Sequence, residues 1–556
     1  MTQVRSTEGA RRSPMQDIVT PPERAARYRT EGLWTDDTLA SKVNEHADSV
    51  PDSVAVIDDL GAGVHTYGQL RRDAARLARA LARLGITVGD VVSLQLPNRY
   101  RTVVAIVAVQ SLGAVLNPLL PNYRVHEISH VLETAGSRIL VTPGVYRNFD
   151  YVSMAVELRA LGREFVHLVD DDGAPDETSL PALIAGRSDD RDAPLGAVRS
   201  PVSELIFTSG TESVPKAIMH TEANANCAVR TLFSDLGVTD ERIVWMPSPV
   251  GHSTGFNYGV RAALYHGRPL ILQDRWNAAE AIELLQRHGG TYTLAATTFL
   301  ADLVDECERR GVRLPQLREF GCGGAPVPPD LVRRADALGI QVLRLYGSTE
   351  VLCATWNRPG DTLERRAQTD GLPLSNTEVD IREVGRSLPA GTSGELFVRS
   401  PQASVGFFAD PERTAATYLP DGWIASGDLA VLDDGYVTVV GRKKEIIIRG
   451  GVNIAPREIE EMISAFPEVE RVAVVGVPDD RLGERTCACI VFYPGQRMEL
   501  AEVVSRLRTA GLGVYKLPER LEVMSELPMT PSGKVQKHVI AQRIRAPEVP
   551  GAEGVQ

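Results

Sequence analysis

The sequence predicts an α/β protein in two parts. A large N-terminal domain of α/β subdomains with a small β-rich subdomain precedes a small α+β C-terminal domain. Three observations predict this. Strand-like and helix-like segments alternate over about the first two thirds of the chain, short glycine-punctuated strands follow from about residue 375, and a separate α+β rhythm begins after residue 442. Alternating strands and helices imply sheets that are covered by helices.

The elements of the large domain follow from hydrophobic spacing. Between residues 67 and 84, Leu70, Ala74, Leu77 and Leu81 recur at the spacing of one helix face. The other helices are expected at residues 100–112 and 278–288. Short apolar runs predict strands at residues 54–57, 91–96, 139–141, 243–246, 291–295 and 341–345.

The β-rich subdomain and the C-terminal domain have their own patterns. Strands are expected at residues 379–382, 394–398 and 436–440, and later at 472–477 and 487–493. A helix at 456–465 opens with proline, which the first turn of a helix tolerates. Another helix is expected at 499–510. The predicted divisions are a flexible arm over 1–35, a large domain over 36–443, a small domain over 444–545 and a flexible tail over 546–556.

Composition excludes several classes of protein. Of 556 residues, 43% are hydrophobic and 24% are charged, which is enough apolar material for a large core and excludes a mainly disordered chain. The formal net charge of -12 argues against nucleic acid as a partner, because phosphate binding needs an excess of Lys and Arg.

Cysteine usage and the termini indicate a cytoplasmic protein. The six cysteines lack the spacing of a zinc site, and Cys487 and Cys489 are expected on one face of a strand. A chain with few cysteines and no disulfide pattern fits a reducing cytosol. The polar N-terminus has no apolar segment typical of a secretory signal, and no run reaches the roughly 18 apolar residues of a membrane span.

The first chemical signal is the segment IFTSGTESVPK at residues 206–216. Small hydroxyl side chains and a glycine let backbone N–H groups surround a polyphosphate, and a lysine adds positive charge. The segment is not a Walker A loop, and a Ser/Thr/Gly loop by itself is more often only a turn.

The second signal is LYGSTE at residues 345–350, directly after an expected strand. Ligands in open α/β sheets gather at the carboxyl ends of strands. Glu350 suits Mg²⁺, which takes one or two carboxylates together with phosphate oxygens.

Three more segments complete the set. The segment DGWIASGDL at 421–429 contains Asp428, a carboxylate able to accept both hydroxyls of a ribose. The segment GRKKEIIIRGGVNIAPREIE spans 441–460 and marks the domain boundary. The segment PMTPSGK at 528–534 presents Lys534 at the end of a glycine-containing loop, where it can reach another domain's cleft.

The five segments, in this order and spacing, resemble the adenylate-forming superfamily of acyl- and aryl-CoA synthetases, peptide-synthetase adenylation domains and firefly luciferase. The resemblance extends over about residues 35–545 and is strongest to acid–CoA ligases. It implies ATP, Mg²⁺ and CoA as cofactors, a small acid as substrate, and a small domain that rotates about a hinge at Lys444.

The resemblance also implies site residues. Nucleotide contacts are implied for Thr208, Ser209, Gly210, Thr211, Lys216, Gly324, Ala325, Pro326, Tyr346, Gly347, Asp428 and Arg442. Catalytic roles are implied for Lys534, Thr349, Glu350 and His252, with Glu350 as the Mg²⁺ ligand. The substrate pocket is implied for His252, Phe256, Cys322 and Gly323. For a single histidine such as His252, the alternative is a structural side chain.

The chain departs from the family pattern in the phosphate loop and near the acyl pocket. Glu212 replaces a Thr, Ser213 a Gly, and Ala217 a Gly. A carboxylate beside polyphosphate is unfavourable unless it points outward or pairs with a cation, and we expect Glu212 to point to solvent. Ser426 stands where Thr is usual, and residues 296–299 replace a commonly proline-containing stretch.

The expected function is adenylation of an aryl or medium-length acid followed by transfer to CoA. Two enzymatic alternatives stay open: transfer to a carrier-protein thiol, and activation of nitrite for diazotisation of an aromatic amine in a natural-product pathway. A nucleotide-binding scaffold is the non-enzymatic alternative, because fold does not prove activity. Lys534 and Glu350, whose loss would favour a scaffold, are both present. The oligomeric state stays open, with a homodimer as one alternative.

Overall fold

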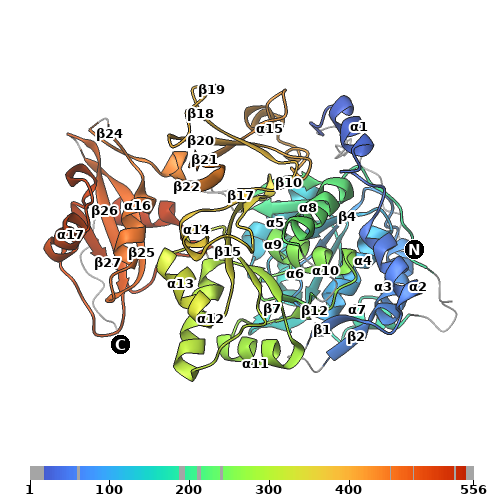
Figure 1. The fold of residues 1–556 in the computed structure, drawn as a ribbon. Coiled ribbons are helices and arrows are strands. Elements are labelled where there is room, and N and C mark those ends of the chain that lie inside the picture. Colours follow the sequence, from blue (N-terminus) through green and yellow to red (C-terminus); the bar gives the residue numbers. More distant parts are fainter. Residues whose placement is uncertain are drawn as a thin grey trace.

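The computed structural model describes residues 18–58, 63–186, 194–208, 215–237, 242–450, 452–479, 481–530 and 534–545. Three main sheets build the large domain, and a fourth sheet builds the small domain, drawn in orange and red in Figure 1. The predicted α/β architecture is confirmed. The predicted phosphate-loop residues Ser209, Gly210 and Thr211 lie outside the described residues, as does the departure at Glu212.

The largest sheet has nine strands in the order β17-β16-β15-β14-β13-β11-β12-β1-β2. Its central strands are parallel, and β2 and β16 pair antiparallel with their neighbours. The strands are β1 (Val54–Asp58), β2 (Gly63–Thr66), β11 (Val244–Met246), β12 (Leu270–Leu272), β13 (Tyr292–Ala295), β14 (Glu319–Cys322), β15 (Val342–Ser348), β16 (Leu352–Trp356) and β17 (Leu372–Pro373).

A second sheet has six strands in the order β10-β9-β4-β3-β5-β8. All neighbours are parallel except β9 and β10, which form an antiparallel pair at one edge. The strands are β3 (Val91–Leu94), β4 (Val115–Pro118), β5 (Ile139–Pro143), β8 (Val166–Asp170), β9 (Glu204–Thr208) and β10 (Lys216–His220). A separate hairpin joins β6 (Val145–Tyr146) and β7 (Phe149–Asp150).

Helices fill the space between the two sheets and cover their outer faces. The main core contains strands of both sheets and a set of helices between them: α2 (Leu39–Ser49), α3 (Tyr67–Arg83), α4 (Tyr100–Ser111), α8 (Glu222–Asp235) and α10 (Ala262–Tyr265). The outer face of the nine-stranded sheet carries α11 (Ala278–His288), α12 (Thr297–Arg310) and α13 (Pro329–Ala337). The six-stranded sheet carries α5 (Val125–Ala135) and α6 (Tyr151–Ala160).

The local sequence explains why these helices begin where they do. The hydroxyl of Thr66 accepts a hydrogen bond from the N–H of Gln69, and the Gln69 side chain accepts one from the N–H of Thr66, so a capping box opens α3.

The shorter helices of the large domain are α7 (Leu180–Ala185), α9 (Ser253–Gly255), α14 (Leu363–Gln368) and α15 (Pro411–Thr417).

The β-rich subdomain is an antiparallel sheet in the order β19-β18-β20-β21-β22. Its strands are β18 (Glu378–Glu383), β19 (Arg386–Ser387), β20 (Ser393–Arg399), β21 (Ile424–Asp433) and β22 (Tyr436–Arg442). A 3₁₀ turn over Lys443–Glu445 then leads into the small domain. The expected hinge, Lys444, is exposed in this turn.

The small domain packs helices on a sheet in the order β24-β23-β26-β25, with β27 beside β26. Its elements are β23 (Ile447–Arg449), β24 (Val452–Ile454), α16 (Pro456–Ser464), β25 (Val469–Asp479), β26 (Gly483–Phe492), α17 (Leu500–Thr509), a 3₁₀ turn over Val514–Lys516, β27 (Arg520–Val523) and α18 (Lys537–Arg545). Cys487 and Cys489 are buried with sulfur atoms 3.9 Å apart, which confirms that they share one face of β26.

The expectation of a flexible arm over residues 1–35 is wrong for residues 18–35. Helix α1 spans Pro22–Thr30, and the buried side chains of Tyr28 and Trp34 pack against Cys227 of α8. The indole N–H of Trp34 donates to the carbonyl of Pro401 at 2.7 Å. The surrounding arginines and other polar residues make this segment look exposed in the sequence.

Within the described ranges, no helix is both long and apolar enough to cross a membrane.

Candidate active site

Thr208 and Lys216, which are expected to contact phosphate, lie at one edge of the six-stranded sheet. We call this place the phosphate corner. Strand β9 ends at Thr208, and Lys216 begins β10 directly opposite it. The hydroxyl of Thr208 is buried, and none of the described residues forms a hydrogen bond with it. A buried hydroxyl without a partner is costly, so this oxygen suits a ligand that brings its own donor or acceptor.

Glu350 faces this corner from the nine-stranded sheet. Strand β15 ends at Ser348, and Glu350 lies in the turn before β16. Its Oε1 lies 2.8 Å from the Lys216 ammonium. Burial alone would raise the pKa of Glu350, but the charge and hydrogen bond of Lys216 outweigh burial, so the pKa is lowered. Glu350 is therefore a carboxylate that stays ionised, as a metal ligand must.

His220, which the sequence reasoning missed, contacts the same turn. It lies four residues after Lys216 on β10 and is fully buried. Asn224 Nδ2 donates to Nδ1 of His220 at 2.8 Å, so Nε2 carries the proton and donates to the carbonyl of Thr349 at 2.8 Å. Burial lowers the pKa of His220 to about 4, which keeps the ring neutral. The i, i+4 spacing on one strand was the only available sequence signal.

The predicted ribose pair is formed by neighbouring strands of the β-rich sheet. Asp428 of β21 lies opposite Arg442 of β22, and Arg442 Nε lies 3.0 Å from Asp428 Oδ1. The hydroxyl of Tyr346 donates to Asp428 Oδ2 at 2.7 Å. Burial and the neighbouring Asp428 carboxylate raise the pKa of Tyr346 well above its ordinary value. The structure therefore brings together three residues that the sequence separates by up to 96 positions.

Lys534 reaches this region from the small domain. Its Cε lies 3.5 Å from the position that a Cβ on Gly324 would take. Burial lowers the pKa of Lys534 to about 8, helped by the positive charge of Arg442 and opposed by Asp428 and Glu350. The contact with Gly324 and the shared cavity bring the lysine beside residues that were expected to bind the nucleotide.

His252 lies in the same cavity as Lys534. The N–H of Thr254 donates to Nδ1 of His252 at 3.2 Å, so Nε2 carries the proton. Burial, aided by Lys534, lowers the pKa of His252 to about 4. A neutral imidazole here can donate one hydrogen bond, which suits a substrate carboxylate.

The cavity is narrow, about 100 Å³, and both domains line it. Among the described residues that line it, Lys534 carries the only formal charge, because His252 is neutral. Predicted residues in the lining are His252, Gly323, Gly324, Gly347, Thr349 and Lys534. The other lining residues are Ser248, Pro249, Ser253, Thr254, Tyr258, Leu294, Ala296, Phe299, Leu345, Ser348, Leu352 and Cys353.

Two residues predicted for the substrate pocket lie elsewhere. Phe256 opens a π-helical segment over Phe256–Arg261 and is fully buried in the core between the two sheets. Cys322 ends β14 and packs against the outer helices. Burial raises its pKa to about 12. Phe256 lies two positions after the lining residue Thr254, and Cys322 lies directly before the lining residue Gly323. The side chains of Phe256 and Cys322 nevertheless point into the core.

The loop after β14 contains the remaining predicted contacts. Gly324 has a φ of +77°, which L side chains rarely adopt. Pro326 is exposed, and its carbonyl accepts a hydrogen bond from the Thr297 hydroxyl at 3.0 Å. Ala325 is partly buried between them. This loop borders the cavity on the side from which Lys534 enters.

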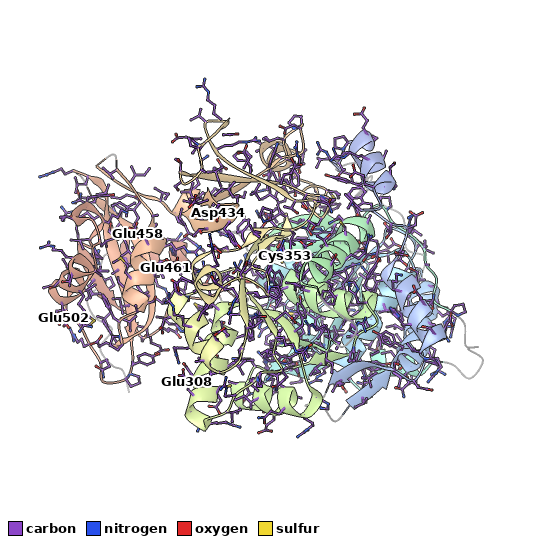
Figure 2. All side chains as sticks on the ribbon, viewed as in Figure 1. Glu308, Cys353, Asp434, Glu458, Glu461 and Glu502 are labelled. Carbon is purple, nitrogen blue, oxygen red and sulfur yellow. The ribbon has the colours of Figure 1, made fainter. Side chains whose placement is uncertain are left out.

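Leu352 and Tyr258 are lining residues that the sequence reasoning missed. Leu352 has a φ of +54°, an unusual conformation for a branched side chain. The hydroxyl of Tyr258 accepts a hydrogen bond from the N–H of Cys353 at 2.6 Å. Cys353 lies within the large domain in Figure 2. A strained residue two positions after Glu350 indicates a tight turn beside this carboxylate.

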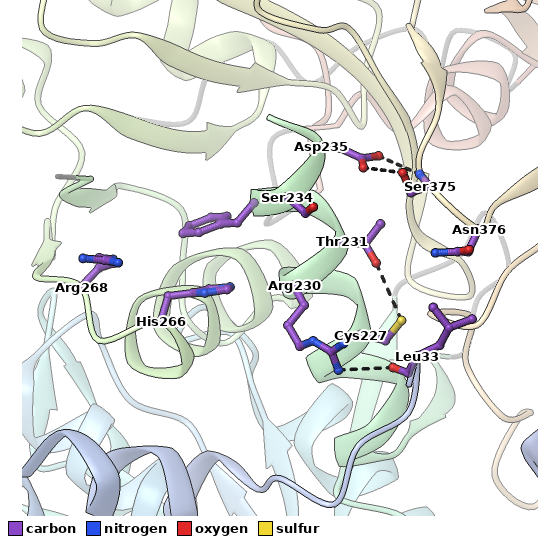
Figure 3. A pocket seen from close by; sticks show the side chains of 11 residues that line it. Leu33, Cys227, Arg230, Thr231, Ser234, Asp235, His266, Arg268, Ser375 and Asn376 are labelled. Carbon is purple, nitrogen blue, oxygen red and sulfur yellow. Dashed lines mark hydrogen bonds between the residues drawn. The ribbon is translucent and has the colours of Figure 1, made fainter. Parts of the chain in front are cut away.

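A larger hollow, about 500 Å³, lies away from this cavity (Figure 3). It is lined by the C-terminal half of α8 together with Leu33, His266, Arg268, Ser375 and Asn376. It contains none of the predicted site residues. The larger hollow therefore contains no residue expected in the site, whereas Lys534, His252 and Thr349, which were expected there, line the smaller cavity together.

Comparison with known families agrees with this geometry. A model described as AMP-binding enzyme matches residues 43–408, which is more than half of the chain. The chain belongs to the AMP-binding enzyme family. A second model, AMP-binding enzyme C-terminal domain, matches residues 458–534 and ends at the lysine of the cavity. The expected membership of the adenylate-forming superfamily is confirmed, and this AMP-binding enzyme is an adenylate-forming ligase.

Three proteins illustrate its similarities. A medium-chain fatty-acid–CoA ligase of Escherichia coli (strain K12) is 36% identical over 531 residues, which cover 94% of this chain and 93% of the relative. A salicyl-AMP ligase / salicyl-S-ArCP synthetase of Mycobacterium tuberculosis is 33% identical over 535 residues, 94% of each protein. The solved structure of an amide bond synthetase from Marinactinospora thermotolerans superposes with a TM-score of 0.81 at 28% identity, covering 91% of this AMP-binding enzyme and 99% of that chain.

Proposed function

We propose that this enzyme uses ATP and Mg²⁺ to convert a small aryl or medium-chain carboxylic acid into an acyl-AMP, and then transfers the acyl group to CoA. The observation that supports this most directly is the shared cavity, in which Lys534 of the small domain meets His252 and Thr349 of the large domain. A cationic group that enters from a second domain can stabilise charge on a phosphate and can also be withdrawn.

The nucleotide would lie across the two sheets of the large domain. Asp428 and Arg442 would hold the ribose, and the ring of Tyr346 would stack on adenine. Thr208 and Lys216 would contact the phosphates, together with Ser209, Gly210 and Thr211, which lie outside the described residues. The Thr208 hydroxyl, which is buried and has no hydrogen-bond partner among the described residues, supports a phosphate contact at this point.

The residues present fit a magnesium ion. Among the described residues, no group of three or more His, Cys, Asp and Glu side chains could hold a metal by itself. Mg²⁺ usually binds one or two carboxylates and takes its other ligands from phosphates and water. Glu350, ionised and beside the phosphate corner, is the carboxylate that would hold it. Bound there, the ion would neutralise charge on the polyphosphate.

The acid would lie against the apolar side of the cavity. Tyr258, Leu294, Phe299, Leu345 and Leu352 provide hydrocarbon surface, and no described lining residue could neutralise a second carboxylate besides Lys534. His252 Nε2–H would donate to the reacting carboxylate. These features favour an acid with one charge and an apolar body.

The proposed chemistry balances without further reactants. A carboxylate oxygen attacks the α-phosphorus of ATP, the bond from that phosphorus to the bridging oxygen breaks, and pyrophosphate leaves with its electron pair. The Lys534 ammonium would stabilise charge on the α-phosphate during this displacement. In the second step the CoA thiol loses its proton to solvent and its sulfur attacks the acyl carbon, the bond from that carbon to the phosphate oxygen breaks, and AMP leaves with the electron pair. We place the hinge that exchanges the two steps at Lys444, which is exposed between the domains.

The group that accepts the activated acid differs among the relatives. The relatives named above include a CoA ligase, a synthetase whose name specifies an ArCP thioester, and an amide bond synthetase. CoA is favoured because the relative with 36% identity is a CoA ligase. A carrier-protein thiol and nitrite activation are the alternatives to be tested.

An exchange assay with a panel of acids tests the first step. The enzyme with ATP, Mg²⁺ and labelled pyrophosphate should form labelled ATP only when a substrate acid is present, with octanoate, benzoate, salicylate and nitrite among the candidates. CoA-dependent release of AMP and a thioester mass would support CoA transfer. Exchange without CoA turnover would favour a carrier thiol, product only with nitrite and an aryl amine would favour diazotisation, and silence across the panel would favour a scaffold.

A further inference from the structure

Asp370 connects the two strands that bear the nucleotide site. It lies between α14 and β17 in the large domain. Its Oδ1 accepts hydrogen bonds from Arg344 Nε at 3.1 Å and Nη2 at 2.8 Å. Its Oδ2 accepts from the N–H of Val439 at 2.9 Å. Arg344 is two residues before Tyr346 on β15, and Val439 is three residues before Arg442 on β22.

Arg457 brings the small domain to the same carboxylate. It is the second residue of α16, and its Nη2 lies 3.9 Å from Asp370 Oδ2. The side chains of Arg457 and Asp370 are only 11% and 6% exposed, so water screens the pair weakly. Helix α16 contacts β22, and Glu461 of this helix lies on the side of the small domain that faces the large domain (Figures 1 and 2).

We propose that Arg457 and Asp370 are positioning residues, whose ion pair docks the small domain in the orientation that brings Lys534 to the cavity. The proposal rests on the proposed function in that Lys534 is taken as the group that assists adenylation. Neither residue lines the cavity, so both act through the placement of Lys534.

The location of the pair explains how docking is linked to the site. Asp370 is held by both β15 and β22, and these strands present Tyr346 and Arg442 respectively. A carboxylate fixed by three hydrogen bonds gives Arg457 a rigid target. The small domain is therefore aligned directly against the strands that would hold adenine and ribose.

The same geometry permits release. If the small domain rotates away, Asp370 keeps Arg344 and the Val439 N–H, while Arg457 keeps Glu461, whose Oε1 is 2.9 Å from Arg457 Nε. Neither charge loses all its partners, so separation avoids the large cost of an unpaired buried ion. A contact of this kind favours one orientation without locking it.

The two half-reactions separate this role from a general structural one. Arg457→Gln should slow acid-dependent exchange of pyrophosphate by on the order of tenfold, the effect of one modest ion pair on a rate. Formation of thioester from supplied octanoyl-AMP or salicyl-AMP and CoA should stay unchanged. Arg457→Lys should restore exchange at least in part. Arg506→Gln is the control, because Arg506 pairs with Glu468 and Glu502 within the small domain.

Loss of both half-reactions in Arg457→Gln, or of neither, would overturn the proposal. If the wild-type enzyme shows no exchange with any acid, the proposed function fails, and a second measurement then decides the docking role by itself. Nitroxide labels on Val384→Cys and Val514→Cys report the distance between the domains, because these side chains are 97% and 70% exposed and all six native cysteines are buried.

Arg457→Gln should deplete the interdomain distance that corresponds to the docked orientation, and Arg457→Lys should restore it. Arg506→Gln should leave the distribution as in the parent protein. An Arg457→Gln distribution identical to that of the parent would refute the docking role, whatever the outcome of the exchange assays.

Discussion

The ammonium of Lys216 lies 2.8 Å from Oε1 of Glu350, and the pair joins the edge strand β10 of the six-stranded sheet to the turn between β15 and β16 of the nine-stranded sheet. These two residues come from segments 134 positions apart. The pair keeps Glu350 ionised and holds Lys216 beside the phosphate corner. Each charge therefore orients the other at the place where a polyphosphate and its metal would bind.

Glu350→Gln should raise the Mg²⁺ concentration needed for half-maximal exchange by at least tenfold, because the amide is a poor replacement for a charged oxygen ligand. The measurement is the exchange rate titrated with MgCl₂ at saturating ATP. An unchanged Mg²⁺ requirement would show that another group holds the metal.

Lys216→Gln and Glu350→Gln should be non-additive. Each single change leaves the other charge without its partner, whereas the double change removes both, so the double variant should lose less than the sum of the two single losses. The measurement is a double-mutant cycle on the KM for ATP. Strict additivity would mean that the ion pair does not act as a unit.

Lys534→Ala should lower the adenylation rate on the order of 10²–10³-fold, the usual effect of losing one key electrostatic donor. The fold should persist, because Lys534 itself belongs to neither hydrophobic cluster of the small domain. Exchange assays and circular dichroism of the same preparations check the two parts. A variant that retains full exchange would remove Lys534 from the mechanism.

The rate that depends on Lys534 should also fall at alkaline pH. Because the pKa of Lys534 is lowered to about 8, the ammonium is charged below pH 8 and is lost as the pH rises through this value. Exchange should therefore decline between pH 7 and pH 9. Lys534→Arg keeps its charge throughout and should abolish the decline, even if its rate at pH 7 is lower.

Gly347→Ala should disable the site through the backbone. A Cβ on Gly347 would lie 2.2 Å from the carbonyl oxygen of Leu352, so the bulge between β15 and β16 would have to open. We expect a loss of about 1–3 kcal/mol of stability from overpacking and about 10²-fold in exchange rate from the displaced turn. Gly360→Ala is the control, because nothing lies within 4 Å of its Cβ position. Equal behaviour of the two variants would contradict the steric argument.

Glu204→Gln should change how stability depends on pH. Glu204, Glu222 and Arg261 form a buried cluster, with Arg261 3.3 Å from Glu204 and 2.5 Å from Glu222. Burial raises the pKa of Glu204 to about 7, and Arg261 opposes this. A carboxyl group with a raised folded-state pKa contributes stability that is present below its unfolded pKa, 4.5, and is lost as the pH rises through 7.

The free energy of unfolding of the wild type, relative to Glu204→Gln, should therefore fall by up to about 3 kcal/mol between pH 4.5 and pH 7. Urea unfolding of both proteins across this range, followed by tryptophan fluorescence, measures the difference. Glu222→Gln should instead destabilise at all these pH values by removing the shorter contact to Arg261. A constant difference between wild type and Glu204→Gln would show that Glu204 is ionised throughout.

The sequence predicted most elements because their apolar spacing is local. The helix expected at 278–288 is α11 with the same bounds, and the strand expected at 436–440 is the core of β22. Residues 18–35 were misjudged because Tyr28 and Trp34 are isolated anchors in a polar segment, and their burial depends on a distant helix.

The sequence predicted which types of residue belong to the candidate site. It did not predict the directions in which their side chains point. Thr349, Glu350 and Lys534 are identified by the motifs around them, and His252 by its segment. Phe256 and Cys322 adjoin the same segments, yet they point into the core, because the backbone turns between neighbouring positions. Residues such as His220 and Arg457 lie in or beside motifs, but their partners are remote in sequence.

The sequence by itself determined the alternation of strands and helices, the order of the five segments and hence the family, because each of these depends on neighbouring residues. Only the tertiary structure decided which side chains meet. Lys216 meets Glu350, and Arg457 meets Asp370, across 134 and 87 positions of chain. The first pair forms because two sheets pack together, and the second because the small domain packs against the large one. Neither contact can be predicted from a local sequence pattern, because its two residues are distant in the chain.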